Sequence, residues 1–173
     1  AIYGACALIW RVKLAEILLL ASAPIGAMYT AITLLTGMLW GRPTWGAYWV
    51  WDARLTSELV LLFLYFGVLG LASAYDDARQ GARAAAVLAL VGVINVPIIH
   101  FSVKWWNTLH QGETVRMFGE SSIHGSMLWP LLVMALATKL YFVYALLMRS
   151  RGLLLAQERS KQWVRELLGA GAR

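Results

Sequence analysis

The chain has 173 residues, of which 60% are apolar and only 14% are charged. Soluble globular domains are about 45–50% apolar and about 25% charged, so this composition excludes a disordered chain and argues against an ordinary soluble domain. Each helical crossing of a bilayer needs about 20 apolar residues, so the chain could furnish roughly four or five crossings. The net charge of +6 is then expected to mark cytoplasmic loops rather than a surface for nucleic acid.

The single cysteine, Cys6, lies inside an apolar run. Neither a disulfide nor a C-x-x-C-H haem attachment site can be built from one cysteine, so any haem held by this chain would be bound non-covalently. The sequence opens with Ala1 and enters an apolar stretch at once, without the basic region and cleavage site of a signal peptide. We therefore expect the chain to be cut within a longer protein.

The apolar segments predict an all-α, polytopic membrane bundle with about five spans, the first of them incomplete. Residues 1–10 would cover only about 15 Å as a helix, half a bilayer, and are interpreted as the second half of a span. Asp52 is a predicted N-cap of the third segment. The remaining spans are predicted at residues 14–40, 53–75, 84–103 and 125–148.

The distribution of Lys and Arg predicts the orientation, because positive loops are retained in the cytoplasm. One side carries Arg11, Lys13, Arg79, Arg83 and the six cations of residues 149–173, which makes ten; the other carries the four residues Arg42, Arg54, Lys104 and Arg116. We therefore predict that the tail is cytoplasmic and that two segments, 41–58 and 104–124, face outward.

Two regions are predicted on this basis: a transmembrane bundle, residues 1–148, and a basic tail, residues 149–173. The tail interleaves its cations with apolar side chains such as Leu153, Trp163 and Leu167. This pattern fits an amphipathic helix lying on anionic lipid, with docking to a partner protein as the alternative.

The segment 41–58 is unusually rich in tryptophan and contains Trp45, Trp49, Trp51, Asp52 and Arg54. A helix would place Trp45, Trp49 and Asp52 on one face, whereas an extended chain would align Trp45, Trp49 and Trp51. Either conformation presents a shelf of indoles on which a flat macrocycle could stack. The alternative is an aromatic belt at the membrane interface, where tryptophan is common.

The second outward segment, 104–124, places Trp105 and Trp106 shortly before His110. If this stretch is helical, Trp106 and His110 lie one turn apart. Neutral imidazole is a usual axial ligand of haem iron, and tryptophans would supply walls of low polarity. A histidine near the membrane interface is more often simply hydrogen-bonded, so both interpretations stay open.

The outward cations could meet the propionates of such a macrocycle, because guanidinium binds carboxylate through two parallel hydrogen bonds. The alternatives are loop solvation and a pair between Arg54 and Glu58 at helical spacing. The sequence has no G-x-x-x-x-G-K-[ST] loop and no H-E-x-x-H motif. The chain is therefore not expected to hydrolyse ATP, and a role as an enzyme is not favoured.

The stretches WGAYWVWDARLTSELVLLFLYFG, from Trp45, and NVPIIHFSVKWWNTLHQG, from Asn95, strongly resemble the CcmC family of bacterial cytochrome c maturation, which carries the tryptophan-rich WWD domain. The resemblance runs from about Leu14 to Gly112. It implies a six-helix protein of the bacterial inner membrane that binds haem b transiently at its periplasmic face and delivers it to the haem chaperone CcmE.

The resemblance also implies site residues and partners. Trp45, Trp49, Trp51 and Asp52 match the haem-contacting WWD segment, with Tyr48 where a tryptophan is often found. His110 matches one of two axial ligands, and the other ligand has no counterpart in this chain. Family members work beside an ABC transporter, CcmA with CcmB, and beside the small protein CcmD.

Two other functions compete with haem binding and delivery. One is a WWD-type haem lyase that joins haem to apocytochrome c, although those proteins carry additional helices. The other is a permease for haem or another solute. The favoured hypothesis requires that the indoles of the first outward segment and those of the second, Trp105 and Trp106, converge beside His110. It also requires that Arg54 holds a propionate.

Overall fold

The computed structural model describes residues 1–106, 108–110 and 123–170, and within these residues every regular element is a helix. The elements in chain order are α1 (Ile2–Trp10), α2 (Lys13–Trp45), α3 (Ala53–Ser73), α4 (Ala78–Gly92), α5 (Asn95–Trp105), α6 (Gly125–Gln157) and α7 (Gln162–Ala170).

Four stretches of the described chain are long and apolar enough to cross a bilayer: Lys13–Trp45, Ala53–Ser73, Ala78–Trp105 and Gly125–Gln157. The prediction of an all-α, polytopic membrane protein is confirmed. Helix α1, with 9 residues, is shorter than a crossing, as its apolar run predicted. Helices α2 and α6 have 33 residues each. At about 1.5 Å per residue each measures about 50 Å, so both project beyond a hydrocarbon core of about 30 Å.

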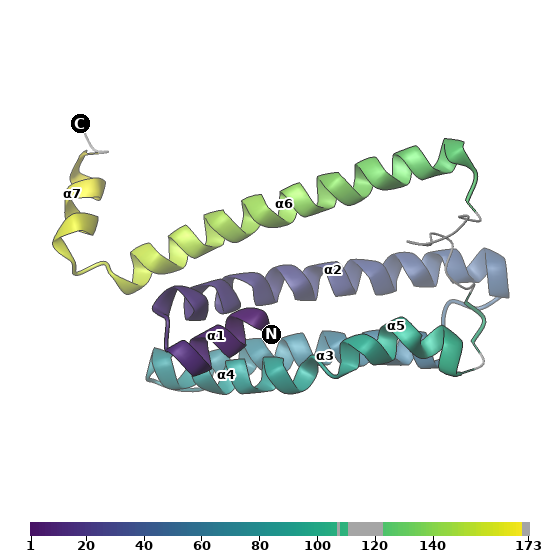
Figure 1. Cartoon of the computed structure of the whole chain (residues 1–173), viewed down its shortest axis with the longest axis horizontal. Coiled ribbons are helices and arrows are strands. Elements are labelled where there is room, and N and C mark those ends of the chain that lie inside the picture. The colour runs from purple at the N-terminus through teal and green to yellow at the C-terminus, as the bar shows by residue number, and fades with distance from the viewer. Residues whose placement is uncertain (107, 111–122, 171–173) are drawn as a thin grey trace.

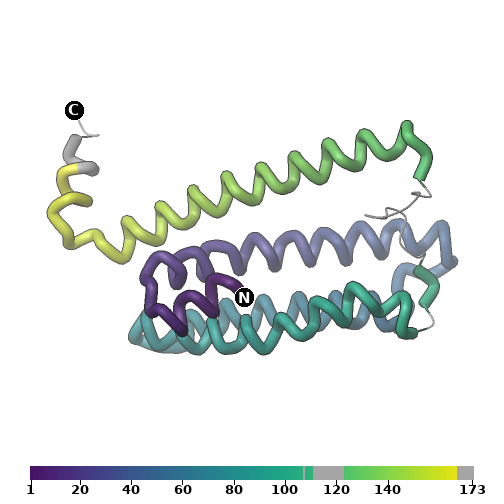
Figure 2. Tube along the Cα trace, viewed as in Figure 1, coloured from purple at the N-terminus to yellow at the C-terminus, as the bar shows by residue number. Residues whose placement is uncertain are grey.

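The long helices lie side by side, and their ends define two ends of the bundle (Figure 1). Helices α2 and α5 finish where α3 and α6 begin, and we call this the WWD end; the opposite end is the tail end. Helix α1 packs against α4 and α2 at the tail end. Helix α6 packs on α2 near the tail end and leans away from it toward the WWD end, as the chain trace also shows (Figure 2).

Small residues bring these helices close together. Ala85 and Ala86 of α4 are fully buried against α2 and α3. An added Cβ on Gly4 would lie 3.2 Å from the carbonyl oxygen of Ala86, and one on Gly81 would lie 2.5 Å from that of Ala72. Close approach of backbones at glycine and alanine is how membrane helices gain packing energy, because lipid supplies no hydrophobic drive between them.

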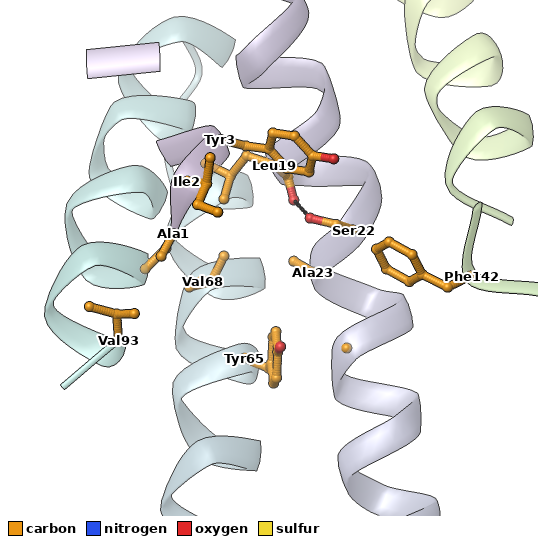
Figure 3. A pocket seen from close by; sticks show the side chains of 12 residues that line it. Ala1, Ile2, Tyr3, Leu19, Ser22, Ala23, Tyr65, Val68, Val93 and Phe142 are labelled. Carbon is orange, nitrogen blue, oxygen red and sulfur yellow. Dashed lines mark hydrogen bonds between the residues drawn. The ribbon is translucent and has the colours of Figure 1, made fainter. Parts of the chain in front are cut away.

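An apolar cavity of about 520 Å³ lies between α1, α2 and α3, with Phe142 of α6 on its far side (Figure 3). Tyr65 points into it from α3, and Ser22 on α2 donates its hydroxyl to the carbonyl of Leu19. All of its α2 residues lie between Leu19 and Gly26, in the half of α2 nearer the tail end. This cavity is therefore separate from the residues that the sequence singled out at the WWD end.

The predicted fourth span, residues 84–103, lies within the candidate crossing Ala78–Trp105, in which the regular helix is interrupted between α4 and α5. Pro97 has no N–H to give to the carbonyl of Val93, which accepts instead from the backbone N of Val96 at 3.1 Å. Across the break, the side-chain amide of Asn95 donates to the carbonyl of Ser57 at 2.8 Å. This hydrogen bond ties the start of α5 to α3.

Several predicted helix ends also differ from the structure: α2 continues past Trp40 to Trp45, and α4 begins at Ala78 rather than at residue 84. The third helix ends at Ser73 rather than at residue 75, and the last spanning helix continues past Met148 to Gln157. Residues 149–157 contain leucine, alanine and arginine, which favour helix, so nothing in them stops α6 where its apolar run finishes. A separate short helix, α7, begins only at Gln162.

Candidate functional site

The WWD segment links α2 to α3 at the WWD end of the bundle. Helix α2 continues through Trp45 and ends at Gly46, whose φ of 78° is the left-handed conformation that glycine adopts without strain. Residues 47–51 are irregular, so neither the helical nor the extended alternative for this segment is correct. As a result Trp45 is held by α2, while Trp49 and Trp51 lie on the connecting segment.

Asp52 has two structural roles. Its side chain caps α3 as predicted, with Oδ1 accepting from the backbone N of Leu55 at 2.8 Å. Its other oxygen, Oδ2, lies 2.7 Å from Nδ1 of His110. The side chain of Asp52 is 5% exposed and that of His110 is 18% exposed. A single carboxylate thus fixes the start of α3 and joins it to a histidine 58 residues further along the chain.

The contact with Asp52 determines which nitrogen of His110 carries the proton and which keeps a lone pair. An ionised carboxylate can only accept hydrogen bonds, so the proton of a neutral imidazole lies on Nδ1. Nε2 then keeps its lone pair. A histidine that binds a metal through one ring nitrogen usually donates its other ring N–H to a carboxylate or a carbonyl. Such a hydrogen bond orients the ring and raises the basicity of the ligating nitrogen.

Tryptophan rings line one side of the imidazole. The Trp45 ring meets the His110 ring edge to face with centroids 4.6 Å apart, and Trp40 meets Trp45 in the same way at 5.4 Å. The predicted pairing of Trp106 with His110 on one helix is wrong. Helix α5 ends at Trp105, and Trp106 is extended, with φ of −128° and ψ of 155°. The indole next to His110 therefore comes from the first outward segment, not from the second.

A cavity of about 410 Å³ opens beside this cluster. It lies between the last turns of α2 and the first turns of α3, with His110 at its edge. Its lining combines aromatic rings, hydroxyls and a pair of opposite charges, from Thr33, Leu34, Thr36, Gly37, Trp40, Trp45, Arg54, Leu55, Glu58 and His110. A volume in the range of about 300–1,000 Å³ with a few convergent polar groups is typical of sites for small molecules and cofactors.

The remaining predicted site residues form two ring pairs of their own. Trp49 and Trp51 meet at 5.3 Å, and Trp105 and Trp106 meet at 5.9 Å. Trp51 is 74% exposed, whereas the indole N–H of Trp49 is buried and has no hydrogen-bond partner within the described residues. The structure therefore brings Trp45, Asp52 and Arg54 together with His110, and a role for these two ring pairs stays a prediction.

Several lining residues were not predicted as members of the site: Thr33, Leu34, Thr36 and Gly37 of α2, and Leu55 and Glu58 of α3. A signal for the first group exists in the sequence. Thr33, Thr36, Gly37 and Trp40 recur at spacings of three and four, which places small, polar and aromatic side chains on one face of an otherwise apolar helix.

The described residues of the cavity offer one imidazole as a possible metal ligand. No group of three or more His, Cys, Asp or Glu side chains that could hold a metal occurs in residues 1–106, 108–110 and 123–170. Haem differs because its porphyrin supplies the equatorial ligands itself, so the protein need offer only axial ones. His110 could supply such a ligand, Trp45 and Trp40 an aromatic wall, and Arg54 a partner for a carboxylate.

The fold and the site define a class: an integral membrane helix bundle with a carboxylate-supported imidazole in a tryptophan-lined cavity at one end. Comparison with known families identifies it further. Residues 1–165 match the family model described as CcmC, heme exporter protein C. The chain belongs to the haem exporter protein C family.

Several curated relatives carry the name "Heme exporter protein C". The protein from Escherichia coli K12 is 53% identical over 161 residues, covering 93% of this chain and 64% of the relative. That from Haemophilus influenzae is 46% identical over 167 residues, 96% of this chain and 68% of the relative. That from Bradyrhizobium diazoefficiens is 60% identical over 136 residues, 79% of this chain and 52% of the relative. The chain thus spans less than two thirds of the Escherichia coli protein.

Proposed function

We propose that this protein binds haem b non-covalently at the WWD end and delivers it to the haem chaperone CcmE for assembly of c-type cytochromes. One observation supports this most strongly: the hydrogen bond from Nδ1 of His110 to Asp52 leaves the lone pair of a partly buried imidazole on Nε2, beside a tryptophan-lined cavity. Membership of the haem exporter protein C family supports the same substrate.

Each residue of the cavity has a role in this proposal. His110 ligates the iron through Nε2, and Asp52 holds the ring in the tautomer that allows this. Trp45 and Trp40 contact the porphyrin and exclude water. Arg54 binds a propionate, for which a guanidinium offers two parallel donors. Trp49 and Trp51 of the segment between α2 and α3, with Trp105 and Trp106 at the end of α5, complete the contacts to the macrocycle.

The proposal includes the setting of the site. Positive charge concentrated at the tail end supports a cytoplasmic tail and a periplasmic WWD end in a bacterial inner membrane. The chain lacks a phosphate-binding loop, so energy from ATP would come from the ABC transporter CcmA and CcmB, with CcmD as a further membrane partner.

Haem titration of the purified protein in detergent tests the central role of His110. We expect a Soret band on titration of the parent protein and a strongly weakened band in His110→Ala. The matched control is His124→Ala, because His124 caps α6, with its ring Nδ1 2.8 Å from Oγ of Ser126, and is not among the cavity residues. Equal titrations for parent and His110→Ala would overturn the proposal.

A permease is the second candidate, because two cavities follow one another along the α2–α3 interface. Thr30, which is 5% exposed, lies on α2 between the residues lining the two cavities. Because Thr30 is buried between the two cavities, it favours a site that holds haem at the WWD end and is closed toward the tail end. Haem flux into proteoliposomes containing this protein alone would favour the permease, and transfer that requires CcmE would favour delivery.

A further inference from the structure

Glu58 is the acidic residue among those that line the WWD-end cavity, and it lies one helical turn after Arg54 on α3. Side chains at this spacing are neighbours on a helix surface, with Cβ atoms about 5–6 Å apart. Glu58 is partly buried and Arg54 is exposed. Burial disfavours the charged form of the Glu58 carboxyl group, and the nearby positive charge of Arg54 offsets part of this effect. The cavity therefore already contains an acidic side chain within electrostatic reach of Arg54.

The facing helix gives Glu58 little other support. The hydroxyl of Thr33 donates to the carbonyl of Tyr29 at 2.9 Å, and that of Thr36 donates to the carbonyl of Ile32 at 2.8 Å. A hydroxyl has one proton to donate, so neither is left for Glu58. Among the residues lining the cavity, Arg54 is the one that carries a fixed positive charge.

We propose that Glu58 competes with a haem propionate for Arg54 and so sets how readily haem leaves the site. This inference rests on the proposed function. Glu58 and a propionate present the same chemical group, an aliphatic carboxylate, to the same guanidinium. When haem loads, the propionate draws Arg54 to itself, and less positive charge is left to offset Glu58 in its partly buried position, which is unfavourable. When haem departs, the charge of Arg54 is again available to Glu58, and this favours release.

Such a competition suits a protein that passes its ligand on. A site optimised only for tight binding would retain haem, whereas an internal carboxylate raises the free energy of the loaded state without removing any contact to the macrocycle. Glu58 is thus a residue that tunes release, and it acts through Arg54 rather than on the iron.

The test measures the rate of haem loss from the loaded protein to excess apomyoglobin, followed by the change in Soret absorption. Glu58→Gln keeps the shape of the side chain and removes its charge. We expect this variant to lose haem about three- to tenfold more slowly, the range for a partly desolvated ion pair. In an Arg54→Gln background, Glu58→Gln should change the rate by less than about twofold, because the group competed for is gone.

Glu166→Gln is the control, since Glu166 lies on α7 and bonds to Gln162. Faster or unchanged haem loss in Glu58→Gln would overturn the inference, and so would an equal effect with and without Arg54. These outcomes differ from failure of the proposed function, in which the parent protein gives no Soret band dependent on His110. If the Soret band is normal and Glu58→Gln loses haem at the same rate as the parent, only the proposed role of Glu58 is refuted.

Discussion

Asp52→Asn separates the two roles of Asp52. Asparagine is as good an N-cap as aspartate, so the cap of α3 at Leu55 is kept, whereas the charged acceptor for Nδ1 of His110 is lost. Removal of a carboxylate behind a metal-binding histidine typically lowers affinity about 10- to 100-fold. We therefore expect haem affinity to fall by about that factor, with little change in thermal stability.

Asp52→Ala is the companion variant, because it removes both contacts. It should lose affinity to a similar extent and in addition lower the free energy of unfolding by about 1 kcal/mol, the usual cost of a lost cap. Affinity is measured by Soret titration and stability by thermal unfolding in the same detergent. Haem affinity in Asp52→Asn equal to that of the parent would refute the supporting role of the carboxylate, and a large loss of stability in that variant would show that it disturbs the fold instead.

Two further predictions concern the bundle. Gly81→Ala should destabilise the packing of α3 on α4 by about 1–3 kcal/mol, since the new Cβ would lie 2.5 Å from the backbone oxygen of Ala72. Gly70→Ala is the control, because a Cβ there would have no tertiary neighbour within 4 Å among the described residues. Equal midpoints of thermal unfolding for the two variants would contradict the close packing at Gly81. The hydrogen bond from Lys13 holds the pKa of Glu158 below its ordinary value of 4.5. Glu158 also accepts from the indole N–H of Trp163 on α7, so it links α7 to the start of α2. This link is stabilising above about pH 4.5 and is lost as the pH falls through the lowered pKa. A spin label on α7 should gain mobility on acidification in the parent and show no such transition in Lys13→Gln.

Much of the fold could be predicted because a bilayer leaves few choices. Helical spans follow from runs of apolar residues, since backbone groups in lipid must be satisfied within the segment. The cap at Asp52 also followed from local chemistry. Pro97 accounts for the hydrogen bond that is lost at Val93, but the hydrogen bond that Asn95 makes across the break to Ser57 is a tertiary contact that the sequence alone does not indicate.

Some residues of the candidate site were indicated by the sequence, but its geometry was not. The chemistry of tryptophan, histidine and arginine indicated Trp45, His110 and Arg54, but the sequence did not show which side chains touch. The left-handed turn at Gly46 redirects the chain after α2 and separates Trp45 from Trp49. Neither a helical nor an extended periodicity can represent such a segment, so the ring that faces His110 was not identified in advance.

The account depends most on a bond between His110 and haem iron. The direct measurement is electron–nuclear double resonance on the ferric haem complex of protein labelled with ¹⁵N-histidine. We predict a hyperfine-coupled imidazole nitrogen in the parent protein that is absent in His110→Gln. Coupling that persists unchanged in His110→Gln, or a parent complex without any coupled histidine nitrogen, would contradict the central claim.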